Sequence, residues 1–176
     1  MEDDVCEYCM LRLYNSSRGR SYYGVLHYGN LAIIPHNDKK LMREMLSIAS
    51  STGDGHSNFA IAPMIQCSKL PNDNEMVSNN IYNDCFHATL IKHSLWEAKN
   101  ILLCGLQAIR CFYSADNVEP FAGFHLKTGS KHIVCTYSPR VKYVDESKFE
   151  KFKEHLKTWY NCSITNDWSV YDFVER

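Results

Sequence analysis

Cysteine is the residue type in this sequence with the clearest capacity for inorganic chemistry, and the 176 residues include eight. Cys6 and Cys9 form a Cys-x-x-Cys pair, whereas Cys67 and Cys85 stand alone beside polar, loop-like stretches. Disulfides are rare in reducing compartments, so clustered cysteines in an intracellular chain indicate metal or redox chemistry. The other four lie in apolar runs or follow a helix, and we expect them to be inert: Cys104, Cys111, Cys135 and Cys162.

The elements that would position these residues alternate along the chain. Continuous apolar runs predict buried strands over residues 31–34, 58–65, 100–105 and 131–137. A helical pattern follows Asp38, which is a suitable N-terminal cap, and further helices are predicted over residues 79–92, 106–113 and 147–160. Such alternation is typical of an α/β fold. It predicts one domain over residues 1–176, a three-layer α/β/α sandwich around a central, mostly parallel four-stranded sheet.

Ligands of parallel sheets bind beyond the carboxyl ends of the strands. The predicted strands therefore nominate the loops that follow them as the place to look for a site. These loops are residues 35–38, 66–68, 105–107 and 138–140.

The order of these segments resembles the iron–sulfur branch of the uracil-DNA glycosylase superfamily, often called family 4. The shared pattern is a Cys-x-x-Cys pair, a strand that ends at a cysteine, a cysteine on a helix, a strand–Gly–helix segment and a Thr-Tyr-x-Pro segment. Residues 101–112 match the strand–Gly–helix segment, and Val134-Cys135-Thr136-Tyr137-Ser138-Pro139 matches the last one. The resemblance runs from about residue 6 to residue 160.

The resemblance implies that Cys6, Cys9, Cys67 and Cys85 hold a 4Fe-4S cluster. Soft thiolates suit iron–sulfur clusters, and four of them complete the outer coordination of a cubane. One structural zinc bound by the same four cysteines is the alternative. The metal would be structural, and it would fasten a cluster-binding arm, residues 1–30, to the sheet near the DNA-binding face.

The resemblance also locates the residues that excise a base, and this sequence departs from the family at each of them. The first loop lacks the acidic stretch and the stacking phenylalanine, and it runs directly into a helix after Asp38. Pro63 occupies the place of the asparagine that reads the base edge. Ser138 occupies the place of the histidine that stabilises the departing oxygen.

Substitute catalytic residues are present in the same loops. His36 and Asp38 could orient water or stabilise charge, and Ser138 can donate a hydrogen bond. Each also has a simpler interpretation: Asp38 as a helix cap, and His36 as a surface loop residue. For DNA contacts we expect Gln107 and Arg140 of these loops, and Lys142 just beyond the last of them.

Composition limits the class of protein. Apolar residues make up 45% and charged residues 22%, as in ordinary globular chains, and the net charge of -1 argues against a generic nucleic-acid coat. No apolar run is long enough to span a membrane, and the acidic start at Met1 is unlike a signal peptide. We therefore expect an intracellular protein, located in the cytoplasm, or in the nucleus if the source is eukaryotic.

Three functions remain open at this level. The first is a divergent DNA glycosylase that hydrolyses the N-glycosidic bond of a damaged or modified pyrimidine. The second is an inactive, glycosylase-derived DNA-binding subunit with a replication or repair protein as its partner; Trp168, Tyr171 and Phe173 of a C-terminal extension, residues 161–176, could dock on that partner or cover the sheet edge. The third is a zinc-stabilised domain without nucleic-acid function.

Overall fold

The computed structural model describes Cys6, Cys9, Leu11, residues 22–24, Leu26, and residues 29–51, 58–67 and 77–173. Most of the expected cluster-binding arm and Ser68 lie outside the described residues. The described chain is α/β, with the order β1-β3-β2-β4-β6-β5 in a mixed sheet of six strands. The strands are β1 (Tyr23–Gly24), β2 (Asn30–His36), β3 (Ala60–Ile65), β4 (Asn100–Cys104), β5 (His125–Thr128) and β6 (Lys131–Thr136).

The four predicted strands are the centre of this sheet, and they pair in parallel as β3-β2-β4-β6. The prediction of four strands in total was wrong, because an antiparallel strand flanks each side. β1 pairs with β3, and β5 pairs with β6. Both added strands are short and partly exposed, so neither has the continuous apolar pattern of a buried parallel strand.

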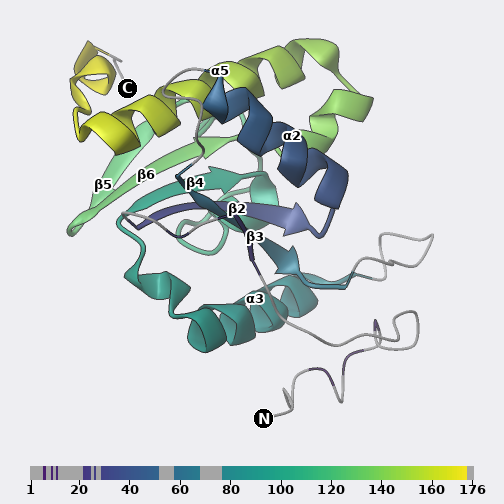
Figure 1. The fold of residues 1–176 in the computed structure, drawn as a ribbon. Helices are drawn as coiled ribbons and strands as arrows, with labels where there is room; N and C mark the ends of the chain where they lie inside the picture. Colours follow the sequence, from purple (N-terminus) through teal and green to yellow (C-terminus); the bar gives the residue numbers. More distant parts are fainter. Residues whose placement is uncertain are drawn as a thin grey trace.

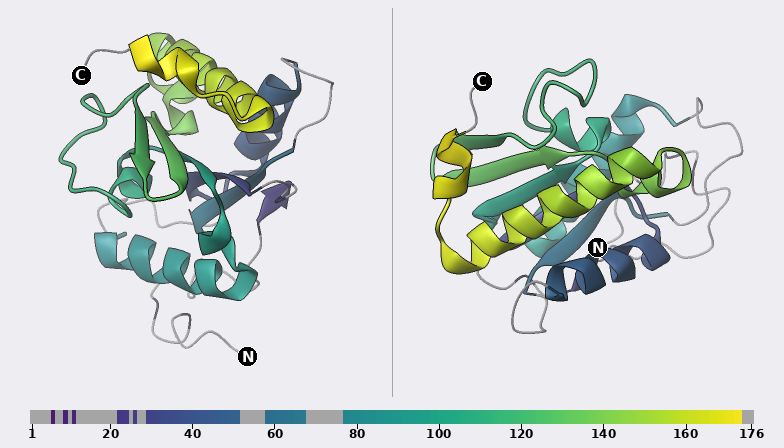
Figure 2. Two further views of the ribbon diagram at one scale, coloured as in Figure 1. Left: turned by 90° about the vertical axis from the view of Figure 1, so that its left-hand side faces the viewer. Right: turned by 90° about the horizontal axis from the view of Figure 1, so that it is seen from above.

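Helices cover both faces of the sheet, as Figures 1 and 2 show. α2 (Lys39–Ser50) and α5 (Glu146–Thr165) lie on one face, and α3 (Asn79–His93) lies on the other. The short helix α4 (Leu106–Ile109) follows β4. Three 3₁₀ turns complete the described elements: η3 (Leu95–Glu97), η4 (Pro139–Tyr143) and η5 (Ser169–Phe173).

Each face of the sheet has its own apolar core. The side chains of Phe59, Phe152 and Trp159 fill the core below α2 and α5. Phe86 and Leu95 belong to the core on the side of α3. Strands with buried side chains on both faces are mostly apolar, which is the pattern that the sequence shows.

Two prolines lie inside strands of this sheet. Pro63 pairs with Ile34 in the parallel register of β3 and β2, but the antiparallel partner β1 reaches only Ala60 and Ile61 of β3. Pro35 likewise lies past Ile33, the last residue of β2 that pairs with β4. At both positions one side of the strand has no pairing strand among the described residues, so a missing N–H is tolerated. β2 therefore continues to His36, two residues beyond the end of the strand predicted over residues 31–34.

The chain reverses its direction of travel across the sheet between β2 and β4. From β2 it passes through α2 to β3 on one side, and then through α3 to β4 on the other side of β2. The two connecting helices lie on opposite faces (Figure 1). In open parallel sheets such a reversal leaves a crevice at the carboxyl ends of the two strands, where ligands bind.

The C-terminal extension covers one edge of the sheet. α5 continues to Thr165, so the first residues of the expected extension belong to this helix. Trp168 stacks on His132 of β6, with ring centroids 4.4 Å apart and an interplanar angle of 2°. Tyr171 contacts His125 of β5, with centroids 5.1 Å apart. Trp168 and Tyr171 therefore cover the sheet edge, which is one of the two roles expected for the aromatic residues of the extension.

None of the helices in the described parts of the chain combines the length and the apolar character that crossing a membrane requires.

Candidate functional site

The carboxyl end of β2 and the segments that follow β4 and β6 meet at Gly105. A Cβ atom at Gly105 would lie 3.0 Å from the Cβ of Ser138 and 3.2 Å from the Cγ of Pro35. The backbone of Gly105 has φ 93° and ψ 165°, a region that only glycine adopts readily. Glycine therefore lets the end of β2 and the segments after β4 and β6 approach more closely than any other residue would.

His36 is the last residue of β2, and Tyr82 of α3 holds its side chain. Its Nε2 and the hydroxyl of Tyr82 form a hydrogen bond of 2.7 Å. The two rings meet edge to face, with centroids 5.6 Å apart. Nδ1 of His36 is buried and has no hydrogen-bond partner among the described residues. His36 is thus a fixed, half-buried side chain, and its interpretation as a surface loop residue was wrong.

Burial sets the charge state of His36. The pKa of the imidazole is lowered to about 4, chiefly by burial and also by the nearby positive charge of Arg140, while the carboxylate of Asp38 acts in the opposite direction. Burial also raises the pKa of the Tyr82 hydroxyl, against the effect of Arg140. At neutral pH this pair is uncharged, so it can exchange hydrogen bonds but does not supply a cation.

Asp38 and Ser138 both cap helices. Oδ1 of Asp38 accepts a hydrogen bond of 3.1 Å from the backbone N–H of Leu41, so the prediction of a cap at Asp38 is confirmed. Oγ of Ser138 accepts one of 3.3 Å from the N–H of Arg140 at the start of η4. Capping uses one oxygen of the Asp38 carboxylate and leaves its second oxygen for another role.

The three expected DNA contacts differ in their surroundings. Arg140 is half-buried and close enough to influence both His36 and Tyr82. Lys142 is exposed, and its Nζ lies 2.6 Å from the Glu44 carboxylate on α2. Gln107 lies on α4, two residues after Gly105, and is half-buried. The structure thus groups Arg140 with His36, whereas Lys142 forms an ion pair with the neighbouring helix.

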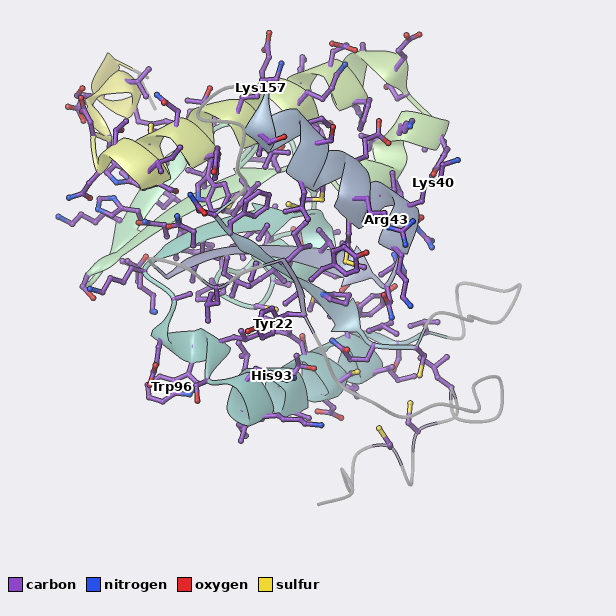
Figure 3. The ribbon with its side chains drawn as sticks, in the orientation of Figure 1. Tyr22, Lys40, Arg43, His93, Trp96 and Lys157 are labelled. Atoms are coloured by element: carbon purple, nitrogen blue, oxygen red, sulfur yellow. The ribbon has the colours of Figure 1, made fainter. Side chains whose placement is uncertain are left out.

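Further cations lie at the same end of the sheet. Lys39 and Lys40 are exposed in the first turn of α2, directly after the carboxyl end of β2. Arg43 donates from Nε to the hydroxyl of Tyr23 over 3.1 Å. Figure 3 shows Lys40 and Arg43 projecting outwards at this end of α2. The site therefore has a local positive surface although the whole chain carries a net charge of -1.

The four expected metal ligands lie on the α3 side of the molecule or next to it. Cys9 and Cys67 pack against the apolar core on that side, and Cys85 is buried on α3. The N–H of Cys9 donates to the carbonyl of Cys6 over 3.4 Å. None of the eight cysteines forms a disulfide. Within the described parts of the chain, no group of three or more His, Cys, Asp or Glu side chains lies close enough together to hold a metal ion.

The donor set fits a four-thiolate centre in its chemistry. Two donors, Cys67 and Cys85, come from elements that contact each other, because Cys67 follows β3 and α3 packs on β3. Soft sulfur ligands suit an iron–sulfur cluster or zinc. Which of the two is bound, and whether all four cysteines take part, stay predictions.

Sequence reasoning missed two residues of this site. Tyr82 is the partner of His36, and its only signal in the sequence is its position three residues before Cys85, on the same buried face of a helix. Asn37 donates from Nδ2 to the carbonyl of Gln66 over 2.6 Å and so joins the loops after β2 and β3. In a sequence, an asparagine in a loop does not indicate its long-range partner.

Comparison with known proteins adds no assignment. Neither the protein-family models nor the curated proteins include a match to this chain. The indications of function therefore come from the residues and the geometry at the strand ends.

Proposed function

We propose that this chain is an iron–sulfur protein of the uracil-DNA glycosylase superfamily that binds DNA at the carboxyl ends of β2, β4 and β6. One observation carries the proposal: the end of β2 and the segments after β4 and β6 meet at Gly105, with a neutral His36 and the cation of Arg140 close to this end of β2. The meeting point is also where the chain reverses across the sheet, and ligands of such sheets bind there.

The charges around this point suit a nucleic-acid backbone. Arg140, Lys40 and Arg43 offer positive charge on one end of the molecule, and they would position phosphates without reading sequence. The ion pair of Lys142 with Glu44 is partly exposed, so a phosphate can replace the carboxylate at small cost. Affinity for DNA should accordingly fall steeply as salt rises.

The reaction that such a site can support is hydrolysis of the N-glycosidic bond of a damaged or modified pyrimidine flipped out of the helix. A neutral imidazole can donate a hydrogen bond to the oxygen of the departing base; in His36 the donor would be Nδ1, with Nε2 accepting from the hydroxyl of Tyr82. The carboxylate oxygen of Asp38 that does not cap α2 can orient the attacking water. The cluster would fasten the chain around Cys6 and Cys9 to the sheet, and it takes no part in this chemistry.

A second function, that of an inactive DNA-binding subunit in replication or repair, has a specific observation in its favour. Asp38 and Ser138 already have structural hydrogen bonds as helix caps. Pro63, in the place of a base-reading amide, is buried in β3 and has no side-chain donor. A protein that only binds DNA would need none of these residues for chemistry.

Cleavage and binding assays separate the two functions. Oligonucleotides, single- and double-stranded, would carry uracil, hydroxymethyluracil and other altered pyrimidines, and abasic product would be measured together with binding. Asp38→Asn is the sharpest variant, because asparagine caps a helix as well as aspartate does but cannot act as a carboxylate. For an enzyme we expect Asp38→Asn to lower the rate by about a hundredfold or more with the fold intact. A wild-type protein that binds but yields no product across the panel would favour the accessory subunit.

Binding itself is tested by charge removal. Arg140→Gln should weaken DNA binding about tenfold or more, since it removes a cation at the centre of the site. Lys157→Gln is the matched control, because Lys157 lies on α5, well away from Lys40 and Arg43 in Figure 3. Equal effects of the two variants would contradict DNA binding at the strand ends.

A further inference from the structure

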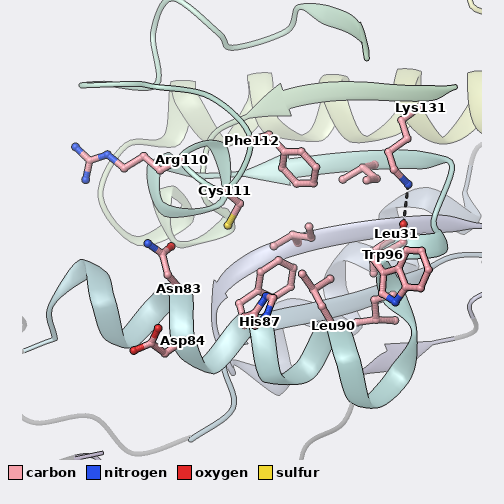
Figure 4. Close-up of a pocket in the computed structure, with 14 residues that line it drawn as sticks. Leu31, Asn83, Asp84, His87, Leu90, Trp96, Arg110, Cys111, Phe112 and Lys131 are labelled. Atoms are coloured by element: carbon pink, nitrogen blue, oxygen red, sulfur yellow. Dashed lines mark hydrogen bonds between the residues drawn. The ribbon is translucent and has the colours of Figure 1, made fainter. Parts of the chain in front are cut away.

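A cavity of about 460 Å³ lies between α3 and the sheet, on the amino-terminal halves of the strands. Leu31 and Ile33 of β2 and Ile101 of β4 line its apolar floor, and Leu90 of α3 forms part of a wall (Figure 4). Its size falls within the range of small-molecule sites, which are mostly apolar with a few polar groups. The site proposed for DNA does not include any of these residues.

Two large aromatic side chains of the cavity are unusually open to solvent. Trp96 in η3 is 61% exposed, and Phe112, after α4, is 39% exposed. Both line the cavity, and so both present a ring to whatever occupies it. Aromatic side chains favour stacked or edge-to-face contacts with other rings, so a planar aromatic group is the shape that this lining suits best.

Three charged side chains line the same cavity: the cations Lys131 and Arg110, and the carboxylate of Asp84. Nζ of Lys131 donates to the carbonyls of Trp96, over 2.8 Å, and of Ala98. These two hydrogen bonds use two of the three N–H donors of the Lys131 ammonium group. Among the described residues, the group makes no other hydrogen bond. Nε of Arg110 donates to the carbonyl of Ala115 over 2.9 Å, which holds this second cation at the opposite end (Figure 4).

We propose that this cavity binds a small molecule with an aromatic ring and an anionic group. The ring lies on the apolar floor beside Trp96 and Phe112, and the anion takes the remaining donor of Lys131. The two cations exceed the one carboxylate, so the cavity favours a negative ligand over a neutral one. A nucleotide and a non-nucleotide aromatic acid share this chemistry.

Fluorescence titration with 1-anilinonaphthalene-8-sulfonate, itself an aromatic anion, tests the proposal. Leu90→Trp should fill the cavity and weaken binding about tenfold or more. Ile91→Trp is the matched control: it is the same substitution on the next residue, which is 63% exposed and does not line the cavity, and it should change affinity less than about twofold. Equal affinity of wild type and Leu90→Trp would overturn the proposal.

A second variant covers the case in which Leu90→Trp does not fold. Trp96→Ala removes an exposed ring while the backbone carbonyl that accepts from Lys131 remains, and it should also weaken binding. An unchanged affinity in Trp96→Ala would likewise count against the site.

Two further measurements test whether the ligand must be anionic and whether it is a nucleotide. Affinity for the sulfonate should fall about threefold or more when salt screens the cations, whereas affinity for the uncharged N-phenyl-1-naphthylamine should not. Equal salt dependence of the two probes would overturn the role of Lys131. Displacement of the sulfonate by thymidine monophosphate would indicate a nucleotide, and displacement by 1-naphthoate alone a non-nucleotide acid.

Discussion

The imidazole of His36 and the hydroxyl of Tyr82 lie 2.7 Å apart, although 46 residues separate them in the sequence. This bond joins the end of β2 to α3, and so it connects the expected DNA-binding loops to the helix that carries Cys85. A structural metal at Cys85 and a functional site at His36 would thus both be attached to α3.

Removal of this bond should be measurable without any substrate. Tyr82→Phe leaves Nε2 of His36 half-buried and unpaired, and we expect it to lower the free energy of unfolding by about 1–2 kcal/mol. Tyr143→Phe is the control, because Tyr143 is 60% exposed, and its effect should stay within about 0.5 kcal/mol. Urea unfolding of the two variants measures the difference, and equal values would contradict a structural role for the bond.

His36 should also make the protein less stable in acid. Its folded-state pKa of about 4 lies below the ordinary value of 6.5, so the unfolded chain binds the proton more readily. The stability that this difference provides is fully present above pH 6.5 and is lost as the pH falls towards 4. After allowance for solvent screening it amounts to about 2 kcal/mol.

Two measurements check this pH dependence. The imidazole C–H resonance of His36 should titrate with a midpoint near 4 in the folded protein, and a midpoint near 6.5 would contradict its burial. Unfolding at several pH values should show a smaller acid loss in His36→Gln than in the wild type. Burial lowers the pKa of His132 and His155 as well, so some loss in acid will remain in that variant.

Gly105 should tolerate no side chain. Gly105→Ala places a Cβ atom 3.0 Å from the Cβ of Ser138 in a backbone conformation reserved for glycine, and we expect a loss of about 3 kcal/mol or more. Gly129→Ala is the matched control: φ is 61° there, and among the described residues no atom beyond its two chain neighbours lies within 4 Å of the added Cβ. Its cost should be that of the backbone alone, about 1 kcal/mol. Thermal unfolding of both variants gives the comparison, and equal losses would mean that the loops do not meet closely.

The elements that could be predicted from the sequence are those whose signal lies in the spacing of neighbouring residues. The four central strands were predicted because both of their faces are buried, and α2 because Asp38 caps it and Leu41, Met42 and Met45 recur on its buried face. α4 is shorter than predicted. After Ile109, the N–H groups of Cys111 and Phe112 donate to the carbonyls three residues earlier, at Ala108 and Ile109, as in a 3₁₀ turn. The spacing of apolar residues does not reveal that change.

Features that depend on distant partners could not be predicted in the same way. β5 became a strand because β6 pairs with it, although its own residues alternate poorly and two of its four are exposed. The stacking of Trp168 on His132 brings the C-terminal extension to the sheet edge. The contact of Tyr82 with His36 likewise depends on how α3 packs on the sheet. None of these contacts follows from spacing in the sequence.

Cys6, Cys9, Cys67 and Cys85 are predicted to hold a 4Fe-4S cluster. The most direct test is the iron, sulfide and zinc content of protein purified without oxygen, together with the visible spectrum. We predict a brown protein with about four irons and four sulfides per chain, and loss of both in Cys67→Ala and Cys85→Ala but not in Cys104→Ala. Colourless wild-type protein with one zinc, or with no metal at all, would contradict the iron–sulfur assignment.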